Sequence, residues 1–214
     1  MKLRFLSFIF FFTAFFAQAQ DAPKAKKLLD EVSAKVKSYN NISIEFRYSI
    51  KNIKENVSQD SKGNVMIQGD KYISNFLGTT EIFDGTKKHT IIPEDEEITI
   101  ESYDVKKDNA LTPSKMLTFY TKGYTYAWDK MLLLGGKKVQ FVKLKPTDSK
   151  SNIKEILLGI DNVTKNIYQL IQIDKDGTRS DLTIISFKTN QTLSENHFIF
   201  VESKYPNYYI NRLD

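Results

Sequence analysis

Residues 81–100, EIFDGTKKHTIIPEDEEITI, combine residue types that could do chemistry at close spacing. This segment holds one histidine, His89, and a run of four consecutive acids at residues 94–97. An imidazole and carboxylates can together bind a zinc ion, or act as a general base and a general acid. The same segment can also be two strands and their turns, so its chemistry depends on what else in the chain could join it.

The sequence offers few further ligands to complete a metal site around His89. Zinc sites usually take three or four His, Cys or carboxylate ligands at short spacing. The chain has two histidines, His89 and His197, far apart in the sequence, and it has no cysteine. His89 lies in a strand-like run, and the acids follow Pro93 in a turn, where acidic side chains are simply solvated. We therefore predict a β-meander here, with no metal and no cofactor.

Short catalytic motifs are also missing. The sequence contains no HExxH, GxSxG, P-loop or calcium-loop pattern. A pair of carboxylates for glycoside hydrolysis meets only in space, so the sequence leaves that alternative open. We expect a protein that is not an enzyme and that acts by binding.

The N-terminal residues 1–19 have the composition of a secretory signal peptide. Lys2 and Arg4 precede an apolar core at residues 5–17, and Ala17-Gln18-Ala19 fits the small-x-small cleavage rule. A retained membrane anchor is the alternative, but the apolar core is too short to span a bilayer. We predict that the mature protein is a single domain, residues 20–214, exported to the periplasm as a soluble protein.

The charge and the missing cysteines exclude several classes of function. The whole chain has a net charge of +5, and removal of Lys2 and Arg4 leaves 29 basic and 26 acidic residues, which is +3. This mild surplus is spread along the chain and gives no basis for nucleic acid binding. Without cysteine there can be no disulfide, no thiol nucleophile and no lipid-modified N-terminal Cys.

Hydrophobic periodicity predicts a mainly β fold. One amphipathic helix is predicted over residues 21–41, and a short second helix begins at Thr112-Pro113. Elsewhere the period changes to two, as at residues 42–51, and later predicted strands include residues 167–173, 182–188 and 198–201. About eleven strands follow one another through short polar turns, so we expect one antiparallel sheet long enough to curl.

The spacing of several weak motifs resembles that of a known family. Asp84-Gly85 is followed by Pro93 and then by Glu97-Ile98. This order resembles a signature of the LolA family of periplasmic lipoprotein carriers, although His89 and Ile91 stand where that family has Trp and Tyr. The resemblance extends over nearly the whole mature chain. Further matching segments are the helix at residues 21–41, Gly63-x-Val65-x-Ile67, Thr112-Pro113, Leu144-x-Pro146, residues 156–161, Asp176-Gly177 and residues 187–190.

One departure from the family concerns release of cargo. Better-studied members carry an Arg-Pro pair after the second strand, and that Arg is linked to closure of a lid. Gln68-Gly69 stand at those positions here. Because Gln has no fixed charge and lacks the five-donor fork of Arg, we assign no gating role to Gln68.

The resemblance implies an unclosed, strongly curled antiparallel half-barrel covered by two or three α-helices, with an apolar cavity between them. For any single residue the alternative is ordinary core packing. The residues predicted to line a lipid-binding cavity are Ile44, Phe46, Tyr48, Val65, Ile67, Tyr72, Phe76, Ile82, Ile100, Trp128 and Phe141, with Met116 and Leu117 as contacts of a helical lid.

The resemblance also implies a function and its partners. The protein would bind the acyl chains of lipoproteins and carry them from the inner to the outer membrane as a monomer. Its partners would be an inner-membrane lipoprotein-releasing transporter, which supplies the energy, and an outer-membrane acceptor that the sequence does not identify. Two alternatives remain: a carrier or sensor of the same fold for another lipid, such as a phospholipid or glycolipid, and an envelope interaction module that uses the curled sheet as a surface.

Overall fold

The computed structural model of the chain describes residues 21–104 and 112–213. The predicted signal peptide and most of the loop between the sixth strand and the second helix lie outside these residues. Within them, the chain forms one helix of normal length, α2 (Asp21–Ser38), and one short helix, α3 (Pro113–Met116). Two 3₁₀ turns, η1 (Phe119–Thr121) and η2 (Glu202–Lys204), complete the helical part.

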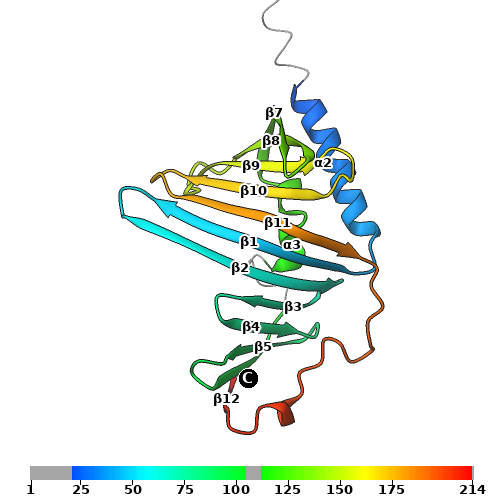
Figure 1. Cartoon of the computed structure of the whole chain (residues 1–214), viewed down its shortest axis with the longest axis vertical. Coiled ribbons are helices and arrows are strands. Elements are labelled where there is room, and N and C mark those ends of the chain that lie inside the picture. Colours follow the sequence, from blue (N-terminus) through cyan, green and yellow to red (C-terminus); the bar gives the residue numbers. More distant parts are fainter. Residues whose placement is uncertain (1–20, 105–111, 214) are drawn as a thin grey trace, which may run out of the picture.

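All described strands belong to a single twelve-stranded sheet (Figure 1). Their spatial order is β12-β6-β5-β4-β3-β2-β1-β11-β10-β9-β8-β7, and the two end strands do not pair with each other, so the sheet is unclosed. The strands are β1 (Ile42–Asn52), β2 (Val57–Gln68), β3 (Lys71–Phe76), β4 (Thr79–Phe83), β5 (Lys87–Ile92), β6 (Glu97–Ser102), β7 (Tyr124–Leu134), β8 (Lys137–Pro146), β9 (Ile153–Asp161), β10 (Ile167–Asp174), β11 (Arg179–Thr189) and β12 (Tyr209–Leu213).

The predicted open, curled, antiparallel sheet is confirmed, with two differences at its C-terminal end. Every neighbouring pair is antiparallel except β12, which runs parallel to β6. Residues 198–201, predicted as a strand, are irregular, and the last strand instead comes later in the chain, at Tyr209–Leu213. The apolar residues near position 200 serve as aromatic contacts rather than as ladder partners, which is why their alternation was misleading.

The sheet has two faces, which we call inner, where α2 and α3 pack, and outer. α2 packs against β7, and α3 packs against β2 and β3. Apolar residues of α2 are buried against the inner side of the sheet because they recur at helical spacing. The main core formed there includes Ala25, Leu28, Leu29, Val32, Ile42, Ile44, Tyr72, Phe83, Val142, Leu158 and Ile184.

The hydrophobic side of the sheet changes face near β4. Tyr72 on β3 pairs with Phe83 on β4 in the inner core, while their neighbours Ile73 and Ile82 pair on the outer side. From β4 to β6 the outer side carries the buried apolar residues, and the C-terminal segment covers it. This second core contains Ile82, Ile91, Ile98, Ile100, Phe200, Tyr205, Tyr208 and Ile210.

We call the two regions the helix-covered half (β7 to β11 and β1 to β3, with α2 and α3) and the tail-covered half (β4 to β6 and β12, with residues 198–210). Figure 1 shows α2 at one end of the sheet and the orange-to-red C-terminal segment descending from β11 to the other. A third, smaller cluster lies on the outer side of the helix-covered half, around Val139, Phe141 and Ile171.

Candidate functional site

An apolar cavity lies between α3 and the inner face of the helix-covered half. Its volume is about 340 Å³, near the lower end of the roughly 300–1,000 Å³ found for ligand pockets. Of the described residues that line it, only Ser74 and Tyr48 carry a polar group, in each case a hydroxyl. The lining residues are Ile44, Phe46, Tyr48, Val65, Ile67, Ser74, Phe76, Pro113, Met116, Leu117, Ile167, Leu170, Leu182 and Ile184.

The floor of the cavity follows from strand alternation in β1, β2 and β11. Ile44 and Ile67 are buried, and Phe46 and Tyr48 are partly buried on the same side of β1. Register places Phe46 opposite Ile184 and Tyr48 opposite Leu182 on β11, so four side chains from two strands meet on one face. The Tyr48 hydroxyl donates to Ser180 Oγ at 3.2 Å. That bond turns its polar end away from the apolar space.

Gly63 on β2 allows two phenylalanines to meet at the edge of the cavity. It pairs with Phe46 on one side and with Phe76 on the other. A Cβ at this position would lie 2.5 Å from Phe46 Cζ and 2.9 Å from the Asn75 carbonyl oxygen. Because no side chain occupies this space, the Phe46 and Phe76 rings approach to 5.4 Å between centroids. A side chain at position 63 would displace the aromatic wall.

The cover of the cavity is the short helix α3. Thr112 caps this helix by accepting a hydrogen bond from Lys115 N at 3.4 Å, and Pro113 suits its first turn. Met116 of this helix and Leu117, the residue that follows it, line the cavity, and the helix packs against β2 and β3. The cover is therefore one turn of helix above a much larger apolar floor.

The structure brings eight of the thirteen predicted residues together and places five elsewhere. The eight that line the cavity are Ile44, Phe46, Tyr48, Val65, Ile67, Phe76, Met116 and Leu117. Tyr72 is buried beside them in the inner core, where its ring lies 5.7 Å from that of Phe83. Trp128 lies under α2, with Lys24 Nζ 4.0 Å from its ring centre.

The other three residues lie on the outer side of the sheet, away from the cavity. Ile82 and Ile100 belong to the tail-covered core, and Phe141 belongs to the small outer cluster. Alternation shows which residues share a face of a strand, but it does not show which face is covered by helices. The apolar residues lie on the inner face up to β3 and on the outer face from β4 to β6. Alternation alone therefore assigns the apolar residues of β4 to β6 to the wrong face.

Sequence reasoning missed the part of the cavity contributed by β10 and β11. Ile167, Leu170, Leu182 and Ile184 line it, and all four lie in segments that were predicted as strands. In β11 the run Ile184-Ile185 breaks the period of two, because a bulge places Ile185 between the partners of Glu45 and Phe46. The exposed Ile185 is the extra residue, and that irregularity concealed the inward set.

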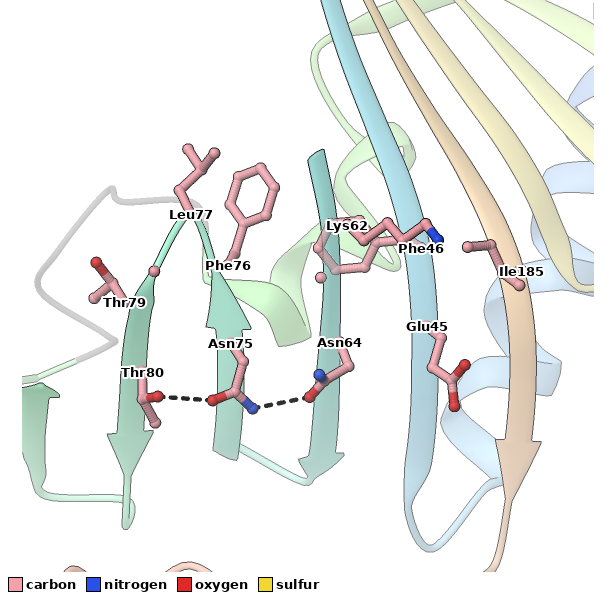
Figure 2. Close-up of a pocket in the computed structure, with 12 residues that line it drawn as sticks. Glu45, Phe46, Lys62, Asn64, Asn75, Phe76, Leu77, Thr79, Thr80 and Ile185 are labelled. Atoms are coloured by element: carbon pink, nitrogen blue, oxygen red, sulfur yellow. Dashed lines mark hydrogen bonds between the residues drawn. The ribbon is translucent and has the colours of Figure 1, made fainter. Parts of the chain in front are cut away.

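A second, wider hollow lies beside the same aromatic pair, where β3 ends and β2 continues (Figure 2). It has a volume of about 480 Å³ and polar walls that include Glu45, Lys62 and Asn64. Asn75 holds its edge by donating to Asn64 Oδ1 at 2.9 Å and accepting from Thr80 Oγ1 at 2.7 Å (Figure 2). It is more open than the cavity under α3, and the charged side chains of Glu45 and Lys62 in its walls oppose burial of an apolar chain.

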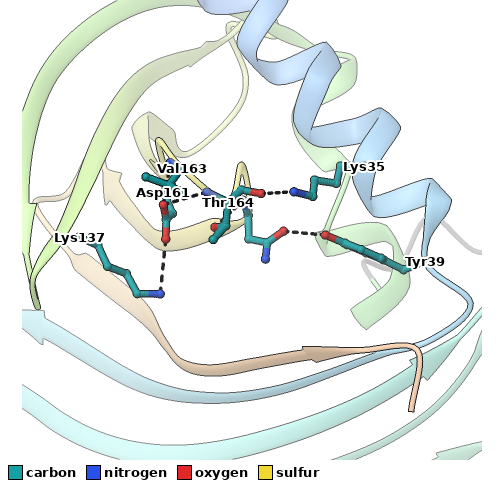
Figure 3. Close-up of polar contacts among 7 residues, drawn as sticks. Lys35, Tyr39, Lys137, Asp161, Val163 and Thr164 are labelled. Carbon is teal, nitrogen blue, oxygen red and sulfur yellow. Dashed lines mark hydrogen bonds and ion pairs between the residues drawn. The ribbon is translucent and has the colours of Figure 1, made fainter. Parts of the chain in front are cut away.

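Helix α2 is fixed to the turn between β9 and β10 by polar contacts (Figure 3). Lys35 Nζ donates to the Thr164 carbonyl, and the Tyr39 hydroxyl donates to Asn166 Oδ1 at 3.1 Å. The turn itself is built on Asp161, which accepts from Val163 N at 2.9 Å and from Thr164 N at 3.1 Å. Although burial opposes it, these bonds and nearby Lys137 lower the pKa of Asp161. The carboxylate stays charged and keeps the turn rigid beneath α2.

His89, the residue that suggested chemistry, is part of the tail-covered core. It is 6% exposed, and its ring stacks on that of Phe200 with 4.5 Å between centroids. Burial lowers its pKa, and its Nδ1 lies 3.3 Å from the Ile82 carbonyl oxygen. Glu94 and its acidic neighbours lie in the turn between β5 and β6. Among residues 21–104 and 112–213, no group of three His, Cys, Asp or Glu side chains is placed to hold a metal ion.

The geometry defines a class of protein: an open half-barrel whose inner face and short helix enclose an apolar cavity. Residues 37–201 match the family model described as outer membrane lipoprotein carrier protein LolA. This match covers most of the chain, and the chain belongs to the LolA family. A comparison with curated proteins gives no match. In the described part of the chain, no helix combines the length and the apolar character needed to cross a membrane.

Solved structures share the fold at low sequence identity. An uncharacterized conserved protein from Thermus thermophilus is 10% identical and has a TM-score of 0.59, with 89% of this chain and 99% of that chain covered. LprF from Mycobacterium bovis is 12% identical and has a TM-score of 0.51, with 82% of this chain and 98% of that chain covered. At such identities the likeness concerns the fold alone.

Proposed function

We propose that this protein is a periplasmic carrier that binds the acyl chains of lipoproteins in the cavity under α3 and moves them from the inner to the outer membrane. The observation that carries the proposal is the apolar cavity itself, left open inside a half-barrel whose other hydrophobic side is covered by the chain. Membership of the LolA family supports the same role. In this proposal the protein acts by binding and not by catalysis.

The size of the cavity agrees with reversible binding. Burying one methylene contributes roughly 0.8 kcal/mol, so a chain of about fifteen methylenes could contribute roughly 12 kcal/mol. Two or three fully buried chains would approach the ceiling of about 18–21 kcal/mol for non-covalent binding, and release would become too slow. A cavity of about 340 Å³ under a one-turn helix holds only part of such a cargo. Displacement of α3, with flexible Met116 on it, would admit more.

Release is proposed to work without a charged gate at the end of β2. Gln68 is exposed and pairs with Lys71 in the β2–β3 ladder, next to the buried Ile67. Alternation directs its side chain to the outer side, away from Met116 and Leu117. Movement of α3 is therefore governed by apolar contacts, and the energy for loading comes from an inner-membrane transporter that hands over the cargo.

A second candidate is a carrier or sensor for another envelope lipid, such as a phospholipid or a glycolipid. The observation that favours it is the lining: among the described residues of the cavity, Ser74 and the Tyr48 hydroxyl are the only side-chain polar groups that could recognise the modified Cys of a lipoprotein. Acyl chains alone would be bound, whatever their head group.

The test uses the mature protein (residues 20–214) and a fluorescent probe that binds in the cavity. A diacylated or triacylated lipopeptide, the same peptide without acyl chains, and a phospholipid each compete with the probe. Displacement by the acylated lipopeptide alone supports the lipoprotein carrier. Equal displacement by phospholipid supports the second candidate. A probe that never binds, with no displacement, contradicts both.

A further inference from the structure

The hairpin between β7 and β8 ends in an exposed apolar tip. We use "hairpin tip" for residues 130–138. Met131 is 48% exposed, Leu132 37% and Leu133 72%. In a strand, consecutive side chains point to opposite faces, so exposure of three in a row means that both faces of the strand are open at residues 131–133, whereas Leu134 packs against the outer cluster. β7 is also an end strand of the described sheet, with β8 as its only neighbour.

The base of the hairpin tip is held firmly. A bulge between Trp128 and Met131 interrupts the ladder, and the buried side chain of Gln140 fills it. Gln140 Nε2 donates to the Asp129 carbonyl at 2.6 Å and to the Phe141 carbonyl at 2.9 Å. The tip is therefore presented by a rigid support and is not a loose strand end.

Basic side chains surround these apolar residues. Lys130, Lys137 and Lys138 are exposed within the tip, which contains no acid. The neighbouring β9–β10 turn adds Val163, which is 81% exposed, and Lys165. This turn is fixed beside the tip because Asn162 N donates to the Lys138 carbonyl at 2.8 Å. Two carboxylates lie beside the tip: Asp129 precedes it in β7, and Asp161, which is only 5% exposed, accepts backbone hydrogen bonds and pairs with Lys137 at 3.5 Å.

From this arrangement we propose that the hairpin tip is a docking site for the surface of an anionic lipid bilayer. Its apolar side chains enter the interfacial layer, and its lysines contact anionic head groups. A bilayer surface fits better than a protein partner because it can surround the tip from both faces. A partner packed on one face would leave either Leu132 or the pair Met131 and Leu133 in water. The insertion is shallow, since the unpaired backbone edge of β7 must stay hydrated.

The inference goes beyond the proposed cargo, since it concerns how the protein meets a membrane. The strength of such binding depends on buried apolar area and on attraction between lysines and anionic lipid. Both contributions are needed here, because three partly exposed apolar residues form a small anchor. Binding is therefore expected to require anionic lipid and to weaken as salt screens the lysines.

The test is co-sedimentation of the mature protein with phosphatidylcholine vesicles that contain or lack phosphatidylglycerol. We expect binding to the anionic vesicles, a loss of at least about tenfold for Leu133→Asp, and a loss of at least about threefold for Lys130→Gln combined with Lys138→Gln. Ile53→Asp is the matched control, because Ile53 is 97% exposed at the tip of the β1–β2 hairpin. It should bind vesicles like the wild-type protein.

Three results would overturn the proposal. They are the absence of anionic-vesicle binding, unchanged binding by Leu133→Asp, or an equal loss with Ile53→Asp. A wild-type dimer that Leu133→Asp converts to a monomer, without vesicle binding, would identify the tip as an interface between copies.

Probe displacement by lipopeptide is measured on the same variants. Because Leu133 lies outside the cavity, we expect Leu133→Asp to retain displacement of the probe by lipopeptide. Failure of docking and failure of the carrier function are therefore distinguishable.

Discussion

The helix-covered and tail-covered halves belong to one sheet but bury their apolar sides in different ways. Each has one apolar side that must be removed from water. In the tail-covered half the chain provides its own cover, and the rings of His89, Phe200 and Tyr205 stack in sequence over the outer side. In the helix-covered half α2 and α3 leave a cavity of about 340 Å³. The difference identifies which apolar side is available to a ligand.

The inner side of the tail-covered half strengthens this contrast, because beyond Phe83 it carries charged side chains. Lys88 pairs with Glu101 at 2.8 Å, and Glu81 accepts from the Tyr72 hydroxyl at 3.3 Å. Register places Glu81 directly opposite Ser74, one of the two polar groups at the cavity. Beyond Phe83 on β4 the inner surface is thus polar, and it offers an acyl chain few further apolar contacts.

The largest expected difference between the halves concerns truncation of a core side chain. Ile98 is fully buried in the tail-covered core, so Ile98→Ala should lower the free energy of unfolding by about 2–5 kcal/mol. Leu182→Ala, at the cavity, should cost less because Leu182 already borders empty space. Urea denaturation of both variants measures the difference. Equal losses would show that the cavity wall is packed as tightly as the tail-covered core.

Filling the cavity should separate stability from binding. Ser74→Leu adds apolar atoms to the space, and we expect the free energy of unfolding to rise by about 1 kcal/mol. The same change should weaken displacement of the cavity probe by lipopeptide about tenfold, which corresponds to about 1.4 kcal/mol. Ser43→Leu is the control, since Ser43 lies on the outer side of β1 between Ile42 and Ile44. If both variants bind lipopeptide like the wild-type protein, the cavity is not the site.

Acid should act on the tail-covered half through His89. Burial lowers the pKa of His89 in the folded protein, while the unfolded chain takes up the proton near pH 6.5. The unfolded state therefore binds more protons as the pH falls below about 6.5, and stability is lost until the folded-state pKa is reached. Urea midpoints on either side of that pH should differ less in His89→Gln than in the wild-type protein. His197→Gln is the control, and an identical pH dependence in His89→Gln would contradict the assignment.

The smallest expected effect comes from a buried hydroxyl in the helix-covered half. Tyr120 is fully buried, and its hydroxyl has no hydrogen-bond partner in the described part of the chain. Burial raises the pKa of Tyr120, so the neutral phenol is the form present. Tyr120→Phe removes an unsatisfied polar atom at nearly constant shape and should leave the free energy of unfolding unchanged or raise it by about 1 kcal/mol. Thermal unfolding measures this, and a clear loss would indicate a partner for the hydroxyl.

Much of the fold could be predicted from the sequence because its signals are local. The helix predicted over residues 21–41, the strand at residues 42–51 and the β-meander within residues 81–100 depend on periodicity and turn chemistry. The structure has all three, although the helix ends at Ser38. The family resemblance was also correct. The parallel pairing of β12 with β6 could not be predicted, since it depends on the path of a segment with no regular period.

The cavity could be predicted only in part, because the alternation of apolar and polar residues along a strand does not show which element covers each face. Phe46 and Val65 line the cavity, since their strands lie under α3. Ile82 and Ile100 show the same alternation but face the C-terminal segment. The bulge at Ile185 removed the remaining local signal for Leu182 and Ile184. Long-range contacts were needed to assign the face of Ile82 and Ile100 and to place Leu182 and Ile184 in the cavity.

The central claim is that acyl chains bind in the helix-covered half and nowhere else on the sheet. The most direct measurement uses a lipopeptide whose acyl chain carries a photoreactive group near its end, cross-linked to the mature protein and mapped by mass spectrometry. The account predicts adducts on Met116, Leu170 or Leu182, which line the cavity, and their loss in Ser74→Leu. Adducts on Phe200 or Tyr205, or adducts that Ser74→Leu leaves unchanged, would contradict it.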